Sequence, residues 1–176
     1  MEEPQGFFSG IRYRKRRTTG MKKSNLKICF DRIIPKEVAN SKKHQAYIAA
    51  ALHGTKRTVN PKMGIAVPLM AIQNNKMWPA GFELKCRFIG GKDLQRAKVM
   101  DIAKEWTQYA NIKIIFVNTK DEHVRIDFME GGSWSAVGTD CVNPEYFHKD
   151  SPTMNLFDWL DAKKTPADQW RQAVLP

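Results

Sequence analysis

The sequence predicts an α+β fold, in which a twisted mixed sheet carries a long packed helix and follows a basic, irregular N-terminal segment. Apolar and charged residues alternate from Phe82 to Phe88, which is the period of a half-buried strand. Apolar residues then recur at helical spacing over 94–110, after an Asp93 placed to cap the helix, and a β-branched run follows over 112–117. A strand, a long helix and a second strand pack as a sheet with the helix on one face. A crossover of this kind makes the two strands parallel.

A further strand, a short extended piece and a last helix are predicted downstream. Residues 124–128 alternate apolar and charged side chains and predict a strand, and residues 131–140 then bend through glycines. Residues 153–156 form another short extended piece. Thr165 as N-cap and Pro166 at the first helical position begin a final helix.

The N-terminal part is predicted to carry a short strand and a short helix before a long connection. Residues 26–34 are apolar enough for a strand, and the Ala-rich segment 44–52 predicts a helix. Residues 53–80 have little periodicity, which indicates linker and loop. The chain is therefore divided into a basic N-terminal segment and linker, residues 1–76, and a folded part, residues 77–176.

The positive charge is concentrated in the first of these two parts. The net charge is +11, and residues 1–76 hold 16 Lys and Arg against 4 acidic residues. A dense basic cluster from Arg12 to Lys27 could neutralise phosphates and bind nucleic acid in a salt-sensitive way. Its aromatic neighbours are too few for a base-stacking platform. A solvated arm, a pro-segment and a membrane-surface segment are the alternatives.

Residue chemistry alone assigns no catalytic centre. The chain has no phosphate-binding glycine loop, no Gly-x-Ser-x-Gly sequence, no secretory signal and no apolar stretch that could span a membrane, and its compartment stays open. Three widely spaced Cys favour buried or free thiols over a disulfide framework. The four His form no His-x-x-x-His pair and are predicted at the surface, two of them as weak metal contacts at best. They are His44, His53, His123 and His148.

Five segments carry a family resemblance. They are Lys76-Met77-Trp78-Pro79, ELKCRFIGG (83–91), AKEWTQYANIKIIF (103–116), VRIDFMEGGSWSAVGTD (124–140) and TMNLF (153–157). The most specific part is Ser-Trp-Ser-x-Val-Gly-Thr-Asp at 133–140. In these segments, which lie within about 100 residues, the chain resembles the astacin-like branch of the metzincin zinc metallopeptidases. The resemblance implies the upper subdomain of the zincin fold.

The resemblance also implies a zinc ion and hydrolysis of peptide bonds by metal-bound water. Metzincins bind zinc through His-Glu-x-x-His-x-x-Gly-x-x-His on the helix that follows the edge strand. Residues 170–175 resemble the first turns of that helix, and Pro176 stands where the first ligand is expected. No catalytic or metal-binding residue is therefore assigned. Zinc is expected for the complete domain, and this chain is expected to be inactive as it stands.

A substrate-binding strand is the one site that the resemblance transfers. Thr153, Met154, Asn155 and Leu156 resemble the edge strand that pairs with an extended peptide, although plain sheet packing explains these residues equally well. The leading interpretation is the N-terminal part of a zinc metalloendopeptidase that acts on peptide or protein substrates. The alternative is a non-enzymatic protein that binds a peptide or a polyanion through an edge strand or the basic arm.

Overall fold

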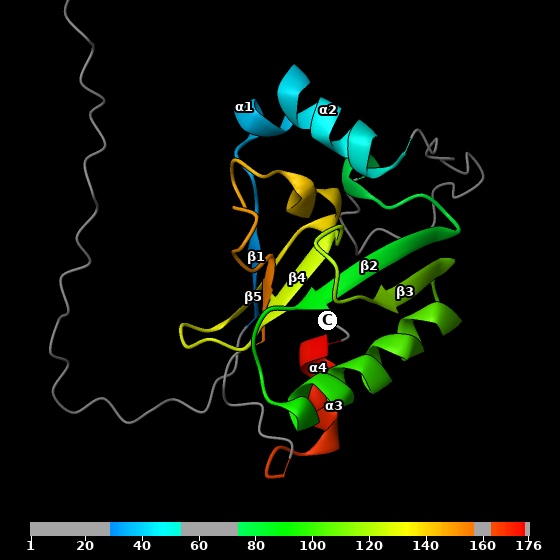
Figure 1. Ribbon diagram of the computed structural model, residues 1–176, viewed down its shortest axis with the longest axis vertical. Helices are drawn as coiled ribbons and strands as arrows, with labels where there is room; N and C mark the ends of the chain where they lie inside the picture. The colour runs from blue at the N-terminus through cyan, green and yellow to red at the C-terminus, as the bar shows by residue number, and fades with distance from the viewer. Residues whose placement is uncertain (1–28, 54–73, 157–162, 175–176) are drawn as a thin grey trace, which may run out of the picture.

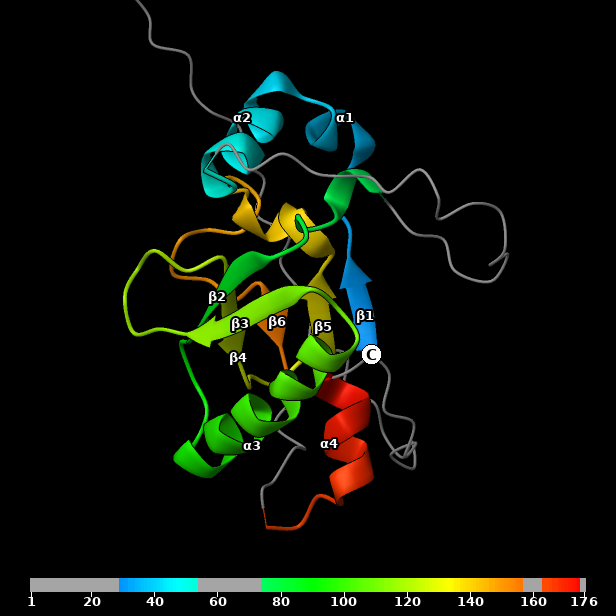
Figure 2. The same ribbon diagram turned by 90° about the vertical axis from the view of Figure 1, so that its right-hand side faces the viewer.

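The computed structural model describes residues 29–53, 74–156 and 163–174 of the 176-residue chain. These residues form a six-stranded sheet in the order β1-β5-β6-β4-β2-β3 (Figures 1 and 2). The strands are β1 (Cys29–Arg32), β2 (Phe82–Phe88), β3 (Ile112–Phe116), β4 (Val124–Asp127), β5 (Ser133–Ala136) and β6 (Met154–Asn155). Neighbouring strands are parallel except β5 and β6, which are antiparallel. The predicted α+β class with a mixed sheet is confirmed.

The helices lie in two groups. The helices α3 (Asp93–Ala103) and α4 (Ala167–Val174) lie together on one side of the sheet (Figures 1 and 2). The helices α1 (Lys36–Ala39) and α2 (Lys42–Ala51) lie at the opposite end of the molecule. Three short 3-10 helices are η1 (Asn74–Lys76), η2 (Lys104–Gln108) and η3 (Gly138–Val142). None of the described helices has the length and apolar character needed to cross a membrane.

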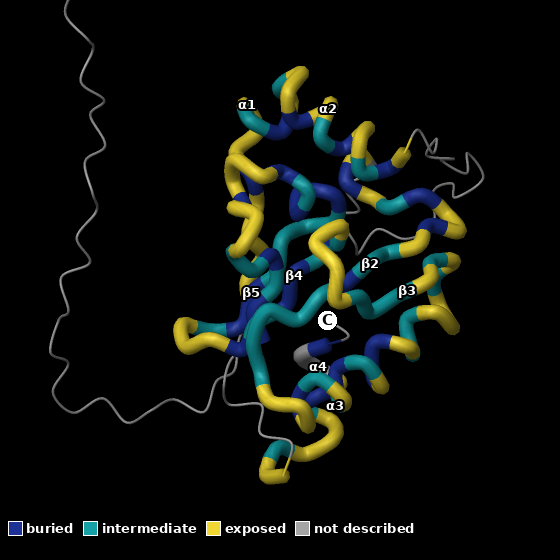
Figure 3. Tube along the Cα trace, viewed as in Figure 1, coloured by how far each residue is buried: buried dark blue, intermediate teal, exposed yellow. Residues whose placement is uncertain are grey.

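Three apolar clusters hold these elements together. In the largest, the central strands and the facing sides of α3 and α4 are buried against each other (Figure 3). Its buried members are Cys86, Val99, Ile102, Ala103, Ile126, Phe128, Leu156, Trp170 and Val174. A second cluster joins the α1 region to β5 through Ile34, Ala39, Trp134 and Phe147. A third joins α2 to β2 through Ile48, Leu52 and Phe82. The N-terminal helices therefore belong to the same packed unit as the sheet.

The elements predicted from periodicity are largely present. Strand β2 has the predicted bounds, Phe82–Phe88, and pairs in parallel with β3 as predicted. The long helix differs from the prediction, because α3 ends at Ala103 and the chain continues as the 3-10 helix η2. Its N-cap is Lys92 rather than Asp93. The Lys92 N–H donates to Gln95 Oε1 at 2.8 Å, so the capping side chain comes from inside the first turn.

Two parts of the fold were not predicted. Strand β5 lies where the sequence predicts a glycine-rich bend, since its four residues are too few to display a period. In addition, β1, α1 and α2 pack with the sheet, although the sequence places the folded part from residue 77 onward. The division of the chain at residues 76 and 77 stays a prediction. The basic cluster from Arg12 to Lys27 lies outside the described residues.

Candidate peptide-binding site at the sheet edge

The four residues predicted to bind substrate lie inside the sheet. Met154 and Asn155 form β6, which pairs with β4 on one side and with β5 on the other. Thr153 N–H donates to Arg125 O at 2.9 Å, and its own carbonyl accepts an N–H of β5 at 2.8 Å. The predicted edge position of Thr153–Leu156 is therefore wrong, because both sides of the strand are already paired. The substrate-binding role of these residues stays a prediction.

Asn155 shapes the neighbouring loop. Its Nδ2 donates to Met129 O at 2.9 Å and to Gly132 O at 2.8 Å, and its Oδ1 accepts the Met129 N–H at 2.8 Å. The residue is 1% exposed. These three bonds use most of the amide's hydrogen-bonding capacity and fix the connection between β4 and β5.

Strand β1 is the edge strand on this side of the sheet, and β5 is the next strand inward. Residues Cys29–Arg32 of β1 lie opposite Ser133–Ala136 in a parallel register. Ala136 N–H donates to the carbonyl of Thr153, the residue before β6, so the N–H of the preceding Ser135 points to the β1 side. A strand from the distant N-terminal segment thus completes the sheet, in the manner of an extended peptide added to an edge.

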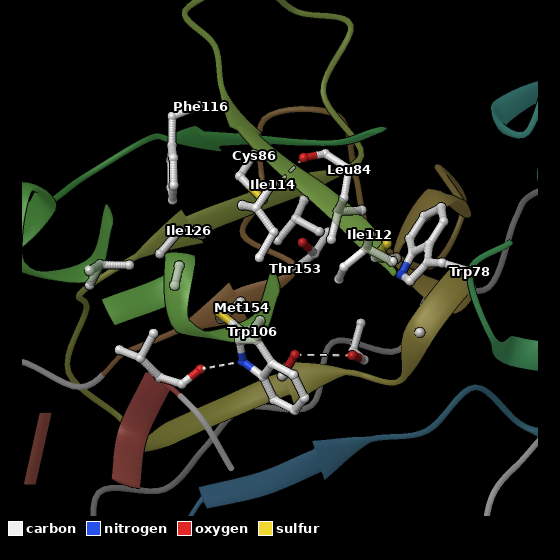
Figure 4. Close-up of a pocket in the computed structure, with 18 residues that line it drawn as sticks. Trp78, Leu84, Cys86, Trp106, Ile112, Ile114, Phe116, Ile126, Thr153 and Met154 are labelled. Carbon is white, nitrogen blue, oxygen red and sulfur yellow. Dashed lines mark hydrogen bonds between the residues drawn. The ribbon is translucent and has the colours of Figure 1, made fainter. Parts of the chain in front are cut away.

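A cavity of about 410 Å³ borders β5 between the sheet and the helices α3 and α4 (Figure 4). Most of its lining is apolar, and Ser135 and Ala136 reach it from β5. Trp106 Nε1 donates to Val174 O at 3.3 Å, which ties η2 to the last turn of α4 at the cavity wall (Figure 4). An apolar side chain of a peptide paired with β5 would match this surface.

A buried polar cluster fixes the segment that follows β5. Lys76 Nζ donates to Asp140 Oδ2 at 2.5 Å, and the Asp140 side chain is fully buried. Gly138 has a φ of +52°, and a Cβ there would lie 2.0 Å from the Lys76 carbonyl oxygen. Only glycine, which has no Cβ, can lie this close to the Lys76 carbonyl group. The Gly-Thr-Asp end of the signature therefore docks η3 against η1 and positions the end of β5.

His44 connects α2 to this polar cluster. Asn143 Oδ1 accepts the N–H groups of Glu145 and Tyr146 at 2.9 and 3.2 Å, so the amide Nδ2 faces His44 Nδ1 at 3.0 Å. Because Nδ1 accepts, the ring proton lies on Nε2, which faces Asp140 Oδ1 at 3.5 Å. His44 is 2% exposed, so the prediction that it lies at the surface is wrong.

His123 is the second buried histidine that was predicted at the surface. Lys85 N–H donates to its Nδ1 at 3.0 Å, and its ring packs against Phe82 and Trp78 with centroids 5.1 and 5.5 Å away. Burial lowers the pKa of His123, and the positive charge of Lys85 lowers it further. The imidazole is therefore held neutral as a hydrogen-bond acceptor.

The stability of the fold is expected to decrease in acid through His123. The unfolded chain binds this proton near the ordinary pKa of 6.5, whereas the folded chain binds it only at lower pH. The contribution of His123 is thus fully present above pH 6.5 and is lost as the pH falls through the folded pKa. Urea unfolding from about pH 8 to about pH 5 measures this change. A His123→Gln chain should decline less over the same range, and identical pH profiles would contradict the expectation.

The described residues do not form a metal site. Within 29–53, 74–156 and 163–174, no group of three or more His, Cys, Asp or Glu could hold a metal ion. His53 and His148 are exposed, as predicted. Structural and catalytic zinc needs at least three converging protein ligands. The described residues therefore do not fit a zinc ion.

The two thiols at the cavity are expected to be unreactive in the folded chain. Cys86 and Cys141 are free and buried, as predicted, and burial raises the pKa of each thiol to about 12. Because the thiolate is the reactive form, a Cys29→Ser chain should resist a disulfide reagent at about pH 8 until it is unfolded. Thiol counts with and without guanidinium measure this. A fast reaction of either thiol in the folded chain would contradict it.

Comparison with known proteins gives the chain a metallopeptidase-like fold. Two solved structures of myroilysin, a metallopeptidase, carry this likeness. The first is 33% identical with a TM-score of 0.51, over 57% of this chain and 47% of that chain. The second is 30% identical with a TM-score of 0.51, over 74% of this chain and 52% of that chain. The match thus spans about half the length of each myroilysin chain. No protein-family model and no curated protein matches the sequence.

Proposed function

We propose that the chain is the sheet-bearing part of a zinc metalloendopeptidase of astacin-like type, in which β5 binds an extended peptide substrate along the edge that β1 occupies. The observation that carries the proposal is the pairing of β1 with β5 over four residues. The likeness to myroilysin supports the class of enzyme. The metzincin-like signature at 133–140 supports the choice of strand, because β5 forms its first half.

Backbone groups give β5 an affinity for extended segments. The Ser135 N–H points away from β6, and an unpaired row of N–H and C=O groups at a sheet edge is a template for another strand. Alternate side chains of β5 also face two different surfaces. Ser135 borders the apolar cavity, whereas Trp134 lies in the cluster with Phe147. A peptide on β5 would place its own alternate side chains against these two surfaces.

Strand β1 already occupies this edge, so an added peptide must compete with it. Because β1 belongs to the same chain as β5, it has an advantage over a free peptide. Ile34, two residues after β1, is 1% exposed and anchors the start of α1, so β1 is tethered close to β5. A short tether gives an effective concentration on the order of millimolar. The side chain of Phe30 contributes little to the core, since the residue is 59% exposed. In this proposal β1 covers the peptide site until a substrate displaces it or the segment is removed.

The proposal assigns hydrolysis to residues outside the described part of the chain. Zinc in this class of enzyme supplies a Lewis acid and an activated water. The contribution of the described residues is to bind the peptide backbone on β5 and to orient it. Activity and zinc binding are therefore proposed for the complete enzyme and not for the described residues.

Peptide binding is tested with a full-length chain that carries Phe30→Pro and Asp31→Pro, called the opened chain below. Both residues are exposed, and two prolines within a four-residue strand remove backbone N–H groups from β1 and restrict its backbone, which weakens the pairing with β5. The probe is a fluorescein-labelled peptide with the sequence of residues 27–36 and Ser in place of Cys29. Fluorescence polarisation should show binding to the opened chain at least about tenfold tighter than to the wild-type chain. A folded opened chain that binds no peptide would overturn the proposal.

The enzyme class is tested separately, because a non-enzymatic peptide-binding protein would use the same edge. The coding DNA on the 3′ side of the Pro176 codon is expected to encode His-Glu-x-x-His-x-x-Gly-x-x-His. The protein expressed through that motif should bind about one zinc ion per chain and cleave casein. A sequence without the motif in any frame would contradict the enzyme and favour the binding protein.

A further inference from the structure

The contact between Arg32 and Trp134 defines a subsite beside β5. The Arg32 Cζ lies over the Trp134 ring, 3.6 Å from its centroid. We infer that the β5 edge selects peptides with a cationic side chain, Arg or Lys, at the position of Arg32, and that Trp134 is the residue that selects it. The inference rests on the proposed function, since it assumes that a peptide takes the place of β1.

The strand register indicates that the Trp134 ring binds a cationic side chain in preference to an aromatic one. Phe30 lies directly opposite Trp134, and Arg32 lies opposite Ala136. Both β1 side chains share one face, because they are two residues apart. Yet Phe30 is 59% exposed, whereas Arg32 reaches diagonally along the sheet to cover the ring. The indole face carries partial negative charge, so it binds a guanidinium or ammonium group better than a neutral or acidic group.

A pocket of about 400 Å³ surrounds this contact and has room for a long side chain. Trp134 and Phe147, which are 9% and 3% exposed, line it with the ring of Tyr146. Glu130 adds a carboxylate to the lining, which also favours a cationic occupant. No residue that lines this pocket also lines the apolar cavity, so the two hollows can contact different peptide side chains.

Buried polar side chains fix both walls of the pocket. Asn155 holds the backbone of Met129, next to Glu130, through the bonds described above. On the other wall, Arg125 donates to Ser151 O at 2.6 Å and to Phe147 O at 3.1 Å. Arg125 and Asn155 are 6% and 1% exposed. The pocket is therefore preorganised, and a ligand does not need to order it.

The test uses the opened chain and the labelled peptide with one position varied. The residue at the position of Arg32 is Arg, Lys, citrulline or Glu, where citrulline is a neutral side chain of nearly the same shape as Arg. The Arg and Lys peptides should bind within a few-fold of each other. The citrulline peptide should bind about 5- to 30-fold more weakly, and the Glu peptide weaker still. This series needs no change at Trp134, so the stability of a Trp134 variant does not affect it.

Two protein variants assign the selectivity to Trp134. Trp134→Phe in the opened chain should reduce the ratio of Arg to citrulline affinity, because a phenyl face attracts a cation less than an indole face does. Trp78→Phe, which changes an indole away from this pocket, should leave the ratio unchanged. An unchanged ratio in the Trp134→Phe chain would overturn the role of Trp134.

The outcomes separate this inference from the proposed function. If all four peptides bind the opened chain equally well, the cationic subsite is overturned while the peptide site on β5 stands. If no peptide binds, the proposed function is overturned and the inference falls with it. Tight binding of the Arg and Lys peptides together with weak binding of the citrulline peptide supports both.

Discussion

Replacing Lys76 by Met is expected to lower the free energy of unfolding by about 3–5 kcal/mol. The side chains of Lys76 and Asp140 are 8% and 0% exposed, and their nitrogen and oxygen lie 2.5 Å apart. The second carboxylate oxygen of Asp140 makes no hydrogen bond within the described part of the chain, since its histidine neighbour stands 3.5 Å away. Without the ammonium group the fold must bury an uncompensated charge. Urea unfolding at about pH 8 measures the loss.

Two controls isolate the buried ion pair from a general effect of removing a lysine. Lys43→Met breaks an ion pair with Glu145 whose side chains are 64% and 52% exposed, so little change is expected. Adding Asp140→Asn to Lys76→Met should recover part of the loss, because a neutral amide costs less to bury than a carboxylate. If both lysine variants have similarly small effects, the Lys76 pair does not stabilise the fold as argued.

Gly138→Ala is expected to cost about 2–4 kcal/mol. The backbone there has a φ of +52°, and the added Cβ would meet the Lys76 carbonyl oxygen at 2.0 Å. The clash is with backbone, so it cannot be relieved by a side-chain rotation. Either η1 or η3 must shift, and β5, which ends two residues earlier, would move with η3. Thermal and urea unfolding measure the cost.

Gly81→Ala is the matched control for Gly138→Ala. Gly81 also has a positive φ, +77°, but a Cβ there would meet nothing within 4 Å. Only the conformational strain of about 1 kcal/mol is expected at this position. Equal destabilisation by the two substitutions would mean that the close approach to Lys76 is not what requires glycine at residue 138.

Local sequence patterns predicted the strands and helices that are long enough to display a hydrophobic period. The alternation in β2 and the apolar spacing in α3 gave the strand, the helix and their order along the chain. Strand β5 is four residues long and was read as a bend. The order of strands was also missed at this edge, because it depends on pairing between β1 and β5, which lie about 100 residues apart in the sequence.

The candidate site was less predictable than the fold, because it is formed by contacts between residues that lie far apart in the sequence. The surface position predicted for His44 failed because its partners, Asn143 and Asp140, lie far away in the sequence. The stacking of Arg32 on Trp134 was not predicted either, because these two residues also lie far apart in the sequence. The family resemblance identified the signature that contains β5, yet it placed the peptide on Thr153–Leu156, which the sheet encloses. Composition and spacing carry no information about which strand is outermost.

Amide hydrogen exchange at β5 tests the central claim most directly. Ser135 N–H points to the β1 side, whereas the neighbouring Ala136 N–H donates to Thr153 O and serves as an internal control. In the opened chain the Ser135 amide should exchange faster than in the wild-type chain, and the peptide of residues 27–36 should slow it again. The Ala136 amide should stay protected throughout. If bound peptide leaves Ser135 exchange unchanged, β5 is not the peptide-binding edge.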